Sequence, residues 1–327
     1  MKFGIIGTNF VSDFFMNGAK ESERCEVVAV CSRKRANAER FAAKYEIEHV
    51  FDTYQEMAES GTIDAAYVAV PNSLHLEVSS YFLKKGIPVF CEKPLASNID
   101  EVMEMVRLAK ENNTYLEEGL IPLYNPNYKK LKESLGMVGK IHQVNLNFSK
   151  YSSRYDAYLN HENPTTFQRE LSNGATMDLG VYVIGFCVGL FGKPKKIYSC
   201  AELLDTGVDV VGSSMFVYDG FVVNLTYSKA SDTRNICEIC GELGTITIDY
   251  PSQPQNIIFY DRKNKTSVTL SEKPKENFYY EIEEMIDRIA DGKIESSDLP
   301  FKTMEDIHEV LTEVRRQSGI IFPCDRF

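Results

Sequence analysis

Glu92-Lys93-Pro94 is the segment of this chain best suited to chemistry, because it directly follows the predicted strand Ile87–Cys91. In a parallel sheet, the carboxyl ends of the strands border the crevice in which ligands bind. The proline biases Lys93 away from helical backbone, and the bond between them also admits the cis form. Partial burial readily lowers the pKa of a lysine, so Lys93 is a candidate to protonate an alkoxide. The competing interpretation is a solvated lysine before a loop proline.

A second candidate segment, Gly7-Thr8-Asn9-Phe10, follows the predicted strand Lys2–Ile6 and partly matches a dinucleotide-binding fingerprint. The pattern G-x-G-x-x-G would place glycines at 7, 9 and 12, but the chain has Asn9 and Ser12. We expect Asn9 to adopt positive φ, which asparagine tolerates well, and Ser12 to permit close packing of helix and sheet. The following helix N-terminus would then offer its N–H groups to a pyrophosphate. An ordinary strand–helix turn is the alternative.

The residues after the second predicted strand, Glu26–Cys31, indicate which dinucleotide binds. NAD-binding folds usually have an acidic residue here, which bonds the ribose 2′-hydroxyl. This chain instead has Ser32 and the cations Arg33-Lys34-Arg35, which open a helix where the macrodipole disfavours positive charge. We therefore predict a preference for NADP(H), with NAD(H) as the second cofactor. A solvated basic turn is the alternative.

A third group, Pro71, Asn72 and His75, follows the predicted strand Asp64–Val70. Small residues and a proline at a strand end permit a flat ring to lie against the backbone, and Asn72 is a candidate to bond a ribose or a carboxamide. His75 begins the next helix and is predicted to face the crevice. A polar residue at a helix start is an equally good interpretation of His75.

The elements that must position these residues alternate between short apolar strands and amphipathic helices. The predicted strands are Lys2–Ile6, Glu26–Cys31, Asp64–Val70, Ile87–Cys91 and Thr114–Glu118. The predicted helices are Phe10–Lys20, Ala36–Tyr45, Tyr54–Ser60, Leu74–Lys85 and Ile99–Asn112. This alternation predicts an α/β fold with a Rossmann-like, doubly wound parallel sheet.

The pattern changes after about residue 120. Successive strands occupy 195–270, and Asp219-Gly220 is a hairpin signal. Further helices are predicted at 127–135, 174–190, 276–291 and 303–318, and a long strand at 140–149. We predict an NAD(P)-binding domain over residues 1–120 and an α+β domain with an open, mostly antiparallel sheet over residues 121–327.

Composition excludes several classes of function. The net charge of −11 argues against nonspecific nucleic-acid binding and against an anionic membrane surface. The first strand begins at Lys2, so no signal peptide is expected and a reduced cytoplasm is the predicted setting. The single CxxC, Cys237–Cys240, has no second pair, and the five histidines form no metal-binding spacing. We predict no metal.

The chain resembles the glucose–fructose oxidoreductase and inositol dehydrogenase family (Gfo/Idh/MocA). The resemblance covers essentially the whole chain and rests on the segments GIIGTNFVS (4–12), VAVPNSLH (68–75), CEKPLA (91–96), GATMDLGVYVIG (174–185), GELGTITI (241–248) and SGIIFP (318–323). It implies an oxidoreductase with a homo-oligomeric assembly, at least a dimer, in which the exposed sheet face packs against another subunit.

The resemblance also points to Asp178 and Tyr182, since a helix of that family carries a D-x-x-x-H or D-x-x-x-Y pair facing the nicotinamide. Positions i and i+4 share a helix face, so both side chains can reach one substrate carbon. Tyrosine rather than histidine at 182 is similar to the sugar and dihydrodiol dehydrogenase branch. A core aromatic is the alternative for Tyr182, because its neighbours are apolar.

The expected reaction is hydride transfer between the nicotinamide and a carbinol or carbonyl carbon of a sugar, polyol or cyclic diol. Lys93 would bond the reacting oxygen and share its proton with Tyr182, while Asp178 would orient the substrate or Lys93. Arg169, which precedes the helix, is the best further candidate to bind substrate. Two alternatives are a cofactor-binding regulator without turnover and a reductase of a non-sugar ring substrate.

Overall fold

The computed structural model describes residues 1–326, which form two compact units. The first unit joins Met1–Gly119 with Lys275–Met304, and the second joins Leu120–Pro274 with residues 305–326. The first boundary lies at the position expected from the sequence. The return of Lys275–Met304 to the first unit differs from the predicted division, which assigned everything after residue 120 to the second domain.

The first unit contains six parallel strands in the order β3-β2-β1-β4-β5-β6, which confirms the predicted doubly wound sheet. The strands are β1 (Lys2–Ile6), β2 (Glu26–Cys31), β3 (His49–Phe51), β4 (Ala65–Val68), β5 (Val89–Glu92) and β6 (Leu116–Gly119). The helices are α1 (Phe10–Glu21), α2 (Arg35–Tyr45), α3 (Tyr54–Glu59), α4 (His75–Lys84), α5 (Ile99–Glu111) and α9 (Tyr279–Ala290). Strand β3 has only three half-buried residues, which is too short to give a sequence pattern.

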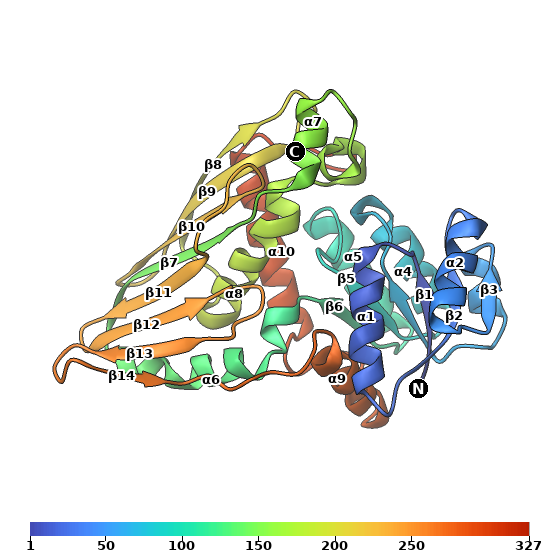
Figure 1. Cartoon of the computed structure of the whole chain (residues 1–327), viewed down its shortest axis with the longest axis horizontal. Coiled ribbons are helices and arrows are strands. Elements are labelled where there is room, and N and C mark those ends of the chain that lie inside the picture. Colours follow the sequence, from blue (N-terminus) through green and yellow to red (C-terminus); the bar gives the residue numbers. More distant parts are fainter. Residues whose placement is uncertain (327) are drawn as a thin grey trace. The chain divides into compact units, whose positions relative to one another are not determined.

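Aromatic packing explains why α9 belongs to the first unit although it lies late in the sequence. Phe278, at the start of α9, is fully buried and places its ring 5.9 Å from those of Phe15 and Phe90 and 6.0 Å from that of Tyr67. Helices α1 and α9 consequently lie side by side (Figure 1). Burial of such rings is the main source of stability for this contact.

The second unit contains an eight-stranded sheet in the order β14-β13-β12-β11-β7-β10-β9-β8. All neighbours are antiparallel except β10 and β7, which confirms the predicted open, mostly antiparallel sheet. Its strands are β7 (Ile141–Ser149), β8 (Lys196–Leu203), β9 (Asp209–Val217), β10 (Val222–Ser228), β11 (Ile236–Gly241), β12 (Gly244–Asp249), β13 (Ile257–Asp261) and β14 (Thr266–Thr269). The Asp219-Gly220 turn joins β9 to β10 as expected, and Gly220 has φ 86°.

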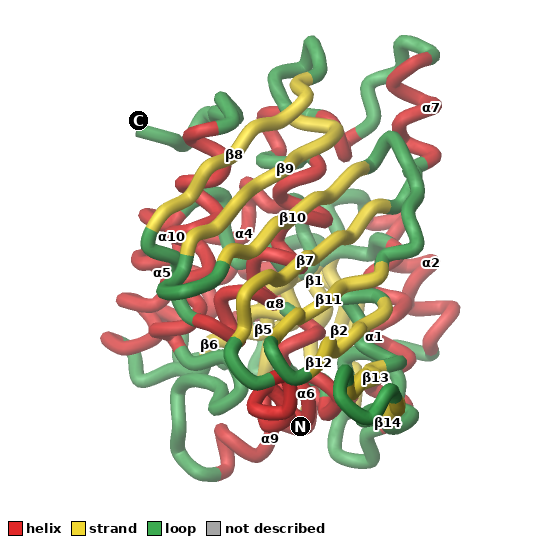
Figure 2. Tube along the Cα trace, turned by 90° about the vertical axis from the view of Figure 1, so that its left-hand side faces the viewer, coloured by secondary structure: helices red, strands yellow, loops and turns green. Residues whose placement is uncertain are grey.

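Helices cover one face of this sheet. Helix α8 (Val181–Phe191) packs on β7 and β10. The second unit also contains α6 (Pro126–Ser134), α7 (Ser153–Leu159) and most of α10 (Phe301–Gln317). Figure 2 looks onto the other broad face, and no helix of the part of the chain that the structure describes lies in front of it. Ser152 caps helix α7 by accepting a hydrogen bond from the Arg154 N–H.

A buried carboxyl group on α9 gives the first unit a specific pH dependence. Glu281 is 1% exposed, and its Oε1 has no hydrogen-bond partner among the described residues. Burial, with a smaller contribution from the nearby Glu92 carboxylate, raises the pKa of Glu281 to about 8. Because this pKa exceeds that of the unfolded chain, Glu281 favours folding at acidic pH, and this contribution falls as pH rises to about 8.

We expect Glu281→Gln to unfold at nearly the wild-type temperature at pH 5 and at a clearly higher temperature at pH 9. The wild type loses about 1.4 kcal/mol per pH unit while the buried acid resists ionisation, whereas the amide does not ionise. Thermal unfolding across this pH range measures the difference. Glu23→Gln, at an exposed position, is the matched control and should follow the wild type. Parallel curves for Glu281→Gln and wild type would contradict the assignment.

Candidate active site

The predicted cofactor residues of the first unit gather along one edge of its sheet. Gly7 follows β1, Ser32 follows β2, Pro71 follows β4 and Lys93 follows β5, and these four strands are neighbours. The strand order reverses between β1 and β4, which is the switch point where open α/β sheets bind ligands. Backbone topology thus brings the separate sequence motifs to one edge.

Gly7 is required by the geometry of the first turn. It has φ +106°, and a Cβ at this position would lie 2.2 Å from the carbonyl oxygen of Ala69. Its N–H donates to the carbonyl of Cys31, at 2.9 Å. The absence of a side chain therefore keeps the loop close to the strand ends, which fits the close approach that a pyrophosphate needs at a helix N-terminus.

Asn9 departs from the prediction, because its φ is −86° rather than positive. Its side chain instead caps α1: Oδ1 accepts from the Val11 N–H, and Nδ2 donates to the Ala69 carbonyl at 2.9 Å. Ser12 is buried, as expected, and its hydroxyl donates to the Gly7 carbonyl at 2.9 Å. Side-chain hydrogen bonds from Asn9 and Ser12 thus hold the turn where the fingerprint has glycines.

Thr8 and Ser32 connect the first turn to the end of β2, where the Thr8 hydroxyl lies 3.3 Å from that of Ser32. Arg33 beside them is exposed. Arg35 is engaged elsewhere, since it forms ion pairs of 2.8 Å with Glu39 and Asp52. The basic cluster available to an anion is therefore smaller than the three-residue run suggests.

His75 and Glu92, two candidates for the cofactor edge, are both buried. His75 has no exposed surface, and its ring nitrogens each lie 2.9 Å from a carbonyl oxygen, of Pro94 and Val70. Burial lowers the pKa of His75. The carboxyl group of Glu92 is also buried and accepts a hydrogen bond of 2.6 Å from Tyr67, and burial raises the pKa of Glu92 to about 7.

The buried His75 acquires a different role, which is to support the loop after β5. It contacts the carbonyl of Pro94, while the N–H of Leu95 donates to Glu118 at 3.0 Å. The peptide bond between Lys93 and Pro94 is cis. Lys93 is half-buried, and interior groups hold the two residues that follow it. Pro71 is exposed and Asn72 half-buried in a short 3-10 turn, Asn72–Leu74.

In the second unit, Asp178 lies in a π-helical turn, Thr176–Gly180, that continues directly into α8. The sequence predicts a single regular helix over this segment. The side chain of Asp209 clamps the turn, because its Oδ2 accepts from the backbone N–H of Thr176 at 2.8 Å and from its hydroxyl at 2.7 Å. Wide helical turns of this kind are frequent at functional sites.

Lys229, which contacts this turn, is a candidate residue that sequence reasoning missed. It follows β10, and its ammonium group forms an ion pair with Oδ2 of Asp178. Its side chain is 6% exposed, whereas that of Asp178 is 44% exposed. A lysine directly after a strand of alternating polarity was the only signal in the sequence, and nothing in the sequence connects it with a helix about 50 residues earlier.

Tyr182 lies at the start of α8, where it is half-buried, and its ring packs edge-on against Phe148 of β7 with centroids 5.5 Å apart. This contact orients the ring. Arg169 is exposed in the short 3-10 turn Arg169–Leu171, which precedes the π-helical turn. Asp178, Tyr182 and Arg169 thus come from one continuous segment of the second unit.

Among residues 1–326, no group of three or more His, Cys, Asp or Glu side chains is arranged to hold an ion. Cys237 and Cys240 lie on strand β11, and all eight cysteines are free thiols. The segment Arg169–Phe191 is apolar and long enough to cross a membrane, but 72% of its most apolar stretch is buried inside the protein. This burial is that of a core helix.

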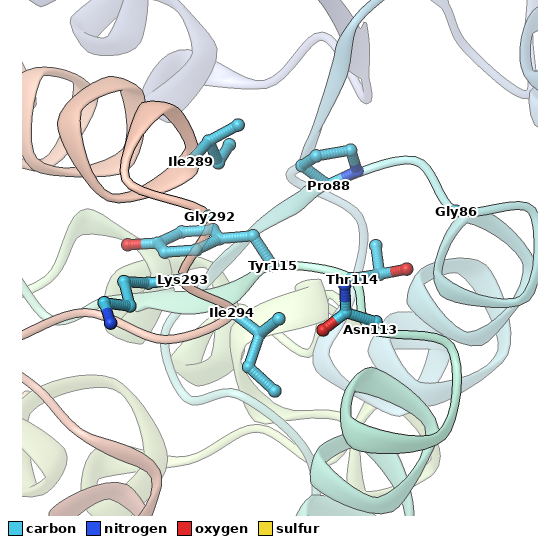
Figure 3. Close-up of a pocket in the computed structure, with 9 residues that line it drawn as sticks. All are labelled: Gly86, Pro88, Asn113, Thr114, Tyr115, Ile289, Gly292, Lys293 and Ile294. Carbon is cyan, nitrogen blue, oxygen red and sulfur yellow. The ribbon is translucent and has the colours of Figure 1, made fainter.

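A cavity of about 200 Å³ lies in the first unit, away from the predicted site (Figure 3). It is lined by Gly86, Pro88, Asn113, Thr114, Tyr115, Ile289, Gly292, Lys293 and Ile294. Pro88 and Tyr115 immediately precede β5 and β6, so the cavity borders the amino ends of these strands. Ligands of open α/β sheets bind at the opposite, carboxyl edge, and the cavity is therefore not a candidate for the cofactor.

Two family models match most of this sequence. The family model described as "Oxidoreductase family, NAD-binding Rossmann fold" (Gfo/Idh/MocA) matches residues 1–120, and the model of the Gfo/Idh/MocA C-terminal domain matches residues 128–247. The scyllo-inositol 2-dehydrogenase (NADP(+)) IolU of Bacillus subtilis is 39% identical over 326 residues, which cover 100% of this chain and 99% of IolU.

More distant similarities also extend over nearly the whole chain. A trans-1,2-dihydrobenzene-1,2-diol dehydrogenase of Danio rerio is 29% identical over 341 residues, which cover 99% of each chain. The crystal structure of KijD10, a 3-ketoreductase from Actinomadura kijaniata, in complex with NADP and TDP-benzene, superposes with a TM-score of 0.86 at 20% identity and covers 97% of this chain and 98% of KijD10. At this identity, the likeness to KijD10 concerns the fold alone.

Proposed function

Because this chain belongs to the Gfo/Idh/MocA family of oxidoreductases, we propose that it is an NADP(H)-dependent dehydrogenase of ring-shaped polyols, sugars or cyclic diols. The observation that carries the proposal is Lys93 at the carboxyl end of β5, in a loop fixed by His75 and Glu118, within a chain 39% identical over its full length to a scyllo-inositol dehydrogenase. The family assignment confirms the predicted resemblance.

The carboxyl edge of the first sheet fits a dinucleotide. The side-chain-free position at Gly7 and the N-terminus of the 12-residue helix α1 suit a pyrophosphate, while Thr8, Ser32 and Arg33 are the groups that would meet a ribose 2′-phosphate. Phe10, Pro71 and Asn72 border the same edge. When bound, the nicotinamide would accept or donate the hydride.

The protein's own contribution is to hold the reacting oxygen and move its proton. Lys93 would donate a hydrogen bond to that oxygen, and a positioned cation would stabilise the negative charge that develops there. Tyr182 would share the proton with Lys93, and the Asp178 carboxylate would orient the substrate or Lys93. The exposed Arg169 would bind a more distant part of the substrate.

The substrate class is tested by a screen of ring compounds. Reduction of NADP⁺ is followed at 340 nm with scyllo-inositol, myo-inositol, common aldoses and a trans-dihydrodiol, and the reverse reaction with the corresponding ketones. We expect turnover with at least one cyclic polyol or diol. Tight NADPH binding without turnover of any of these compounds would instead favour the cofactor-binding regulator or a reductase of a non-sugar ring substrate.

We predict that NADPH binds more tightly than NADH. Ser32 and Arg33 leave the 2′-position without an acidic group, and Arg33 offers a cation to a phosphate. Titration of both reduced cofactors by fluorescence measures the preference. Ser32→Asp with Arg33→Ala should shift it toward NADH, by about tenfold or more, because the new carboxylate repels the phosphate. Arg40→Ala, on the exposed surface of α2, is the control and should leave the preference unchanged.

We further propose that the protein is a homodimer or larger assembly in the cytoplasm, built on the uncovered face of the eight-stranded sheet. This face has a polar centre, where Asn224 donates to Asn145 at 3.1 Å, flanked by exposed apolar residues on the outer strands. Tyr198 is 52% and Met215 39% exposed, and they are direct cross-strand neighbours. Exposed apolar groups gathered on a sheet face are typical of an interface. Eight free thiols agree with a reducing compartment.

Light scattering at micromolar concentration should give a mass at least twice the 37.1 kDa of one chain. Tyr198→Glu with Met215→Glu should convert the assembly to monomers, since two charges would be buried without partners. Met103→Glu is the matched control, because Met103 is equally exposed, at 55%, but lies on α5 of the first unit. A wild-type mass near that of one chain would refute the oligomer.

A further inference from the structure

Lys229 is an almost fully buried cation of the second unit, and it lies beside Asp178. The residue is 4% exposed, and its backbone is fixed on both sides: its N–H donates to the Val210 carbonyl, and its carbonyl accepts from the Ser152 N–H, both at 2.9 Å. A buried ammonium group is strongly unfavourable unless it is paired. Its position therefore depends on the carboxylates around it.

Two carboxyl groups share this cation, and they differ in exposure. Asp178 accepts directly from the Lys229 ammonium group and is partly open to solvent. Asp209 is fully buried, clamps Thr176 at the start of the π-helical turn, and interacts electrostatically with Lys229. Its second oxygen, Oδ1, has no hydrogen-bond partner among the described residues. Burial raises the pKa of Asp209 to about 6, against the opposing hydrogen bonds from Thr176 and the smaller attraction of Lys229.

From this arrangement we infer that Lys229 is a positioning residue for the reaction. Through its ion pair, it keeps Asp178 ionised and fixes the direction of the Asp178 carboxylate. The inference rests on the proposed function, because it assumes that Asp178 serves the substrate or Lys93. Lys229 itself is too buried to contact substrate. The exposed carboxylate does so, and the buried ammonium group determines its charge and orientation.

The purely structural alternative is that Lys229 only balances the buried Asp209. The two roles predict different effects of removing the charge. If Lys229 acts through Asp178, its loss raises the pH at which Asp178 takes up a proton, because an adjacent cation stabilises the carboxylate. If it only balances Asp209, its loss changes stability without changing Asp178. The other titratable groups near this turn are Tyr227 on β10, which contacts the Thr176 hydroxyl at 2.9 Å, and Tyr182 one turn along the helix.

The decisive variant is Lys229→Met, which keeps the length of the side chain and removes its charge. We expect kcat to fall by about 10–100-fold, as for a misplaced catalytic group, while NADPH binding stays near that of wild type. The acid limb of the pH profile of kcat/KM should move up by about one pH unit. Lys229→Arg retains the charge and should restore the acid limb of the profile to its wild-type position. Tyr227→Phe, a change next to the same turn, should lower stability without shifting the acid limb.

A double-mutant cycle separates the two roles. In the Asp178→Asn background, Lys229→Met should lower kcat by less than about threefold, because the group through which it acts is already gone. Multiplicative effects of the two substitutions would overturn the inference, as would an unchanged acid limb in Lys229→Met.

A readout independent of turnover keeps this test distinct from that of the proposed function. Carbon-13 NMR of the aspartate carboxyl groups, assigned with Asp178→Asn, follows the titration of Asp178 in wild type and in Lys229→Met. We expect its midpoint to rise by about one pH unit in the variant. An unchanged midpoint would overturn the inference even if the enzyme is active. Failure of every ring compound in the substrate screen would instead refute the proposed function, and the NMR titration would still decide whether Lys229 controls Asp178.

Discussion

Lys93→Met is expected to lower kcat by about 10²–10⁴-fold while leaving the affinity for NADPH largely intact. The substitution removes a hydrogen-bond donor and a positive charge from the place where an alkoxide would form, but it preserves most of the side-chain volume. The loop should keep its shape, since the hydrogen bond from the Leu95 N–H to Glu118 and the contact between His75 and the Pro94 carbonyl do not involve the Lys93 side chain. Steady-state kinetics and fluorescence titration of NADPH measure the two quantities separately.

Lys85→Met provides the matched control for the loss of a lysine. Lys85 is exposed at the end of α4 and pairs with Glu59 at 3.5 Å, an interaction between solvated charges that contributes little to stability. The kcat of the Lys85→Met variant should stay within about twofold of wild type. A Lys93→Met enzyme that retains full turnover at every pH would show that Lys93 is only a solvated residue before a proline. That result would refute the assignment of the active site.

The strands and helices of the first unit could be predicted because local pattern and tertiary environment agree there. Strand β1, Lys2–Ile6, and strand β2, Glu26–Cys31, have the bounds expected from the sequence, since each is a short apolar run that ends at a polar turn. The edge at which Gly7, Ser32 and Lys93 gather follows from the parallel order of the strands.

Other features depend on contacts that no local pattern encodes. Asn9 caps a helix instead of adopting positive φ, because the Ala69 carbonyl beyond β4 is available to its side chain. His75 turns inward because two carbonyl groups from separate loops converge on it. The π-helical turn at Asp178 is fixed by Asp209, which lies on a strand about 30 residues later. In each case a long-range hydrogen bond overrides the local preference.

The position of Asp178 shows why the site itself was harder to predict than the fold. The spacing of Asp178 and Tyr182 favours a regular helix, in which residues i and i+4 share a face. The π-helical turn changes the geometry of this segment, and the ion pair with Lys229 fixes the carboxylate from another strand. The identity of the candidate residues is visible in the sequence, whereas the groups that orient them are not.

Tyr182→Phe is expected to lower kcat by about 10²-fold and to leave the fold intact. The substitution removes only the hydroxyl group, so the edge-on contact with Phe148 remains and thermal unfolding should change little. Tyr218→Phe is the matched control: the Tyr218 hydroxyl donates to the Gly192 carbonyl at 2.7 Å just beyond α8, so its loss should reduce stability by about 1 kcal/mol without lowering kcat.

The double variant Lys93→Met, Tyr182→Phe tests whether the two residues share one proton-transfer step. Residues that act as a unit are non-additive, so the double variant should lose less activity than the product of the two single effects. Strictly multiplicative losses would mean that the two side chains act in separate steps. Full activity of Tyr182→Phe at every pH would make Tyr182 a packing residue and leave the proton to Lys93 alone, since His75 is buried with both ring nitrogens against backbone carbonyls.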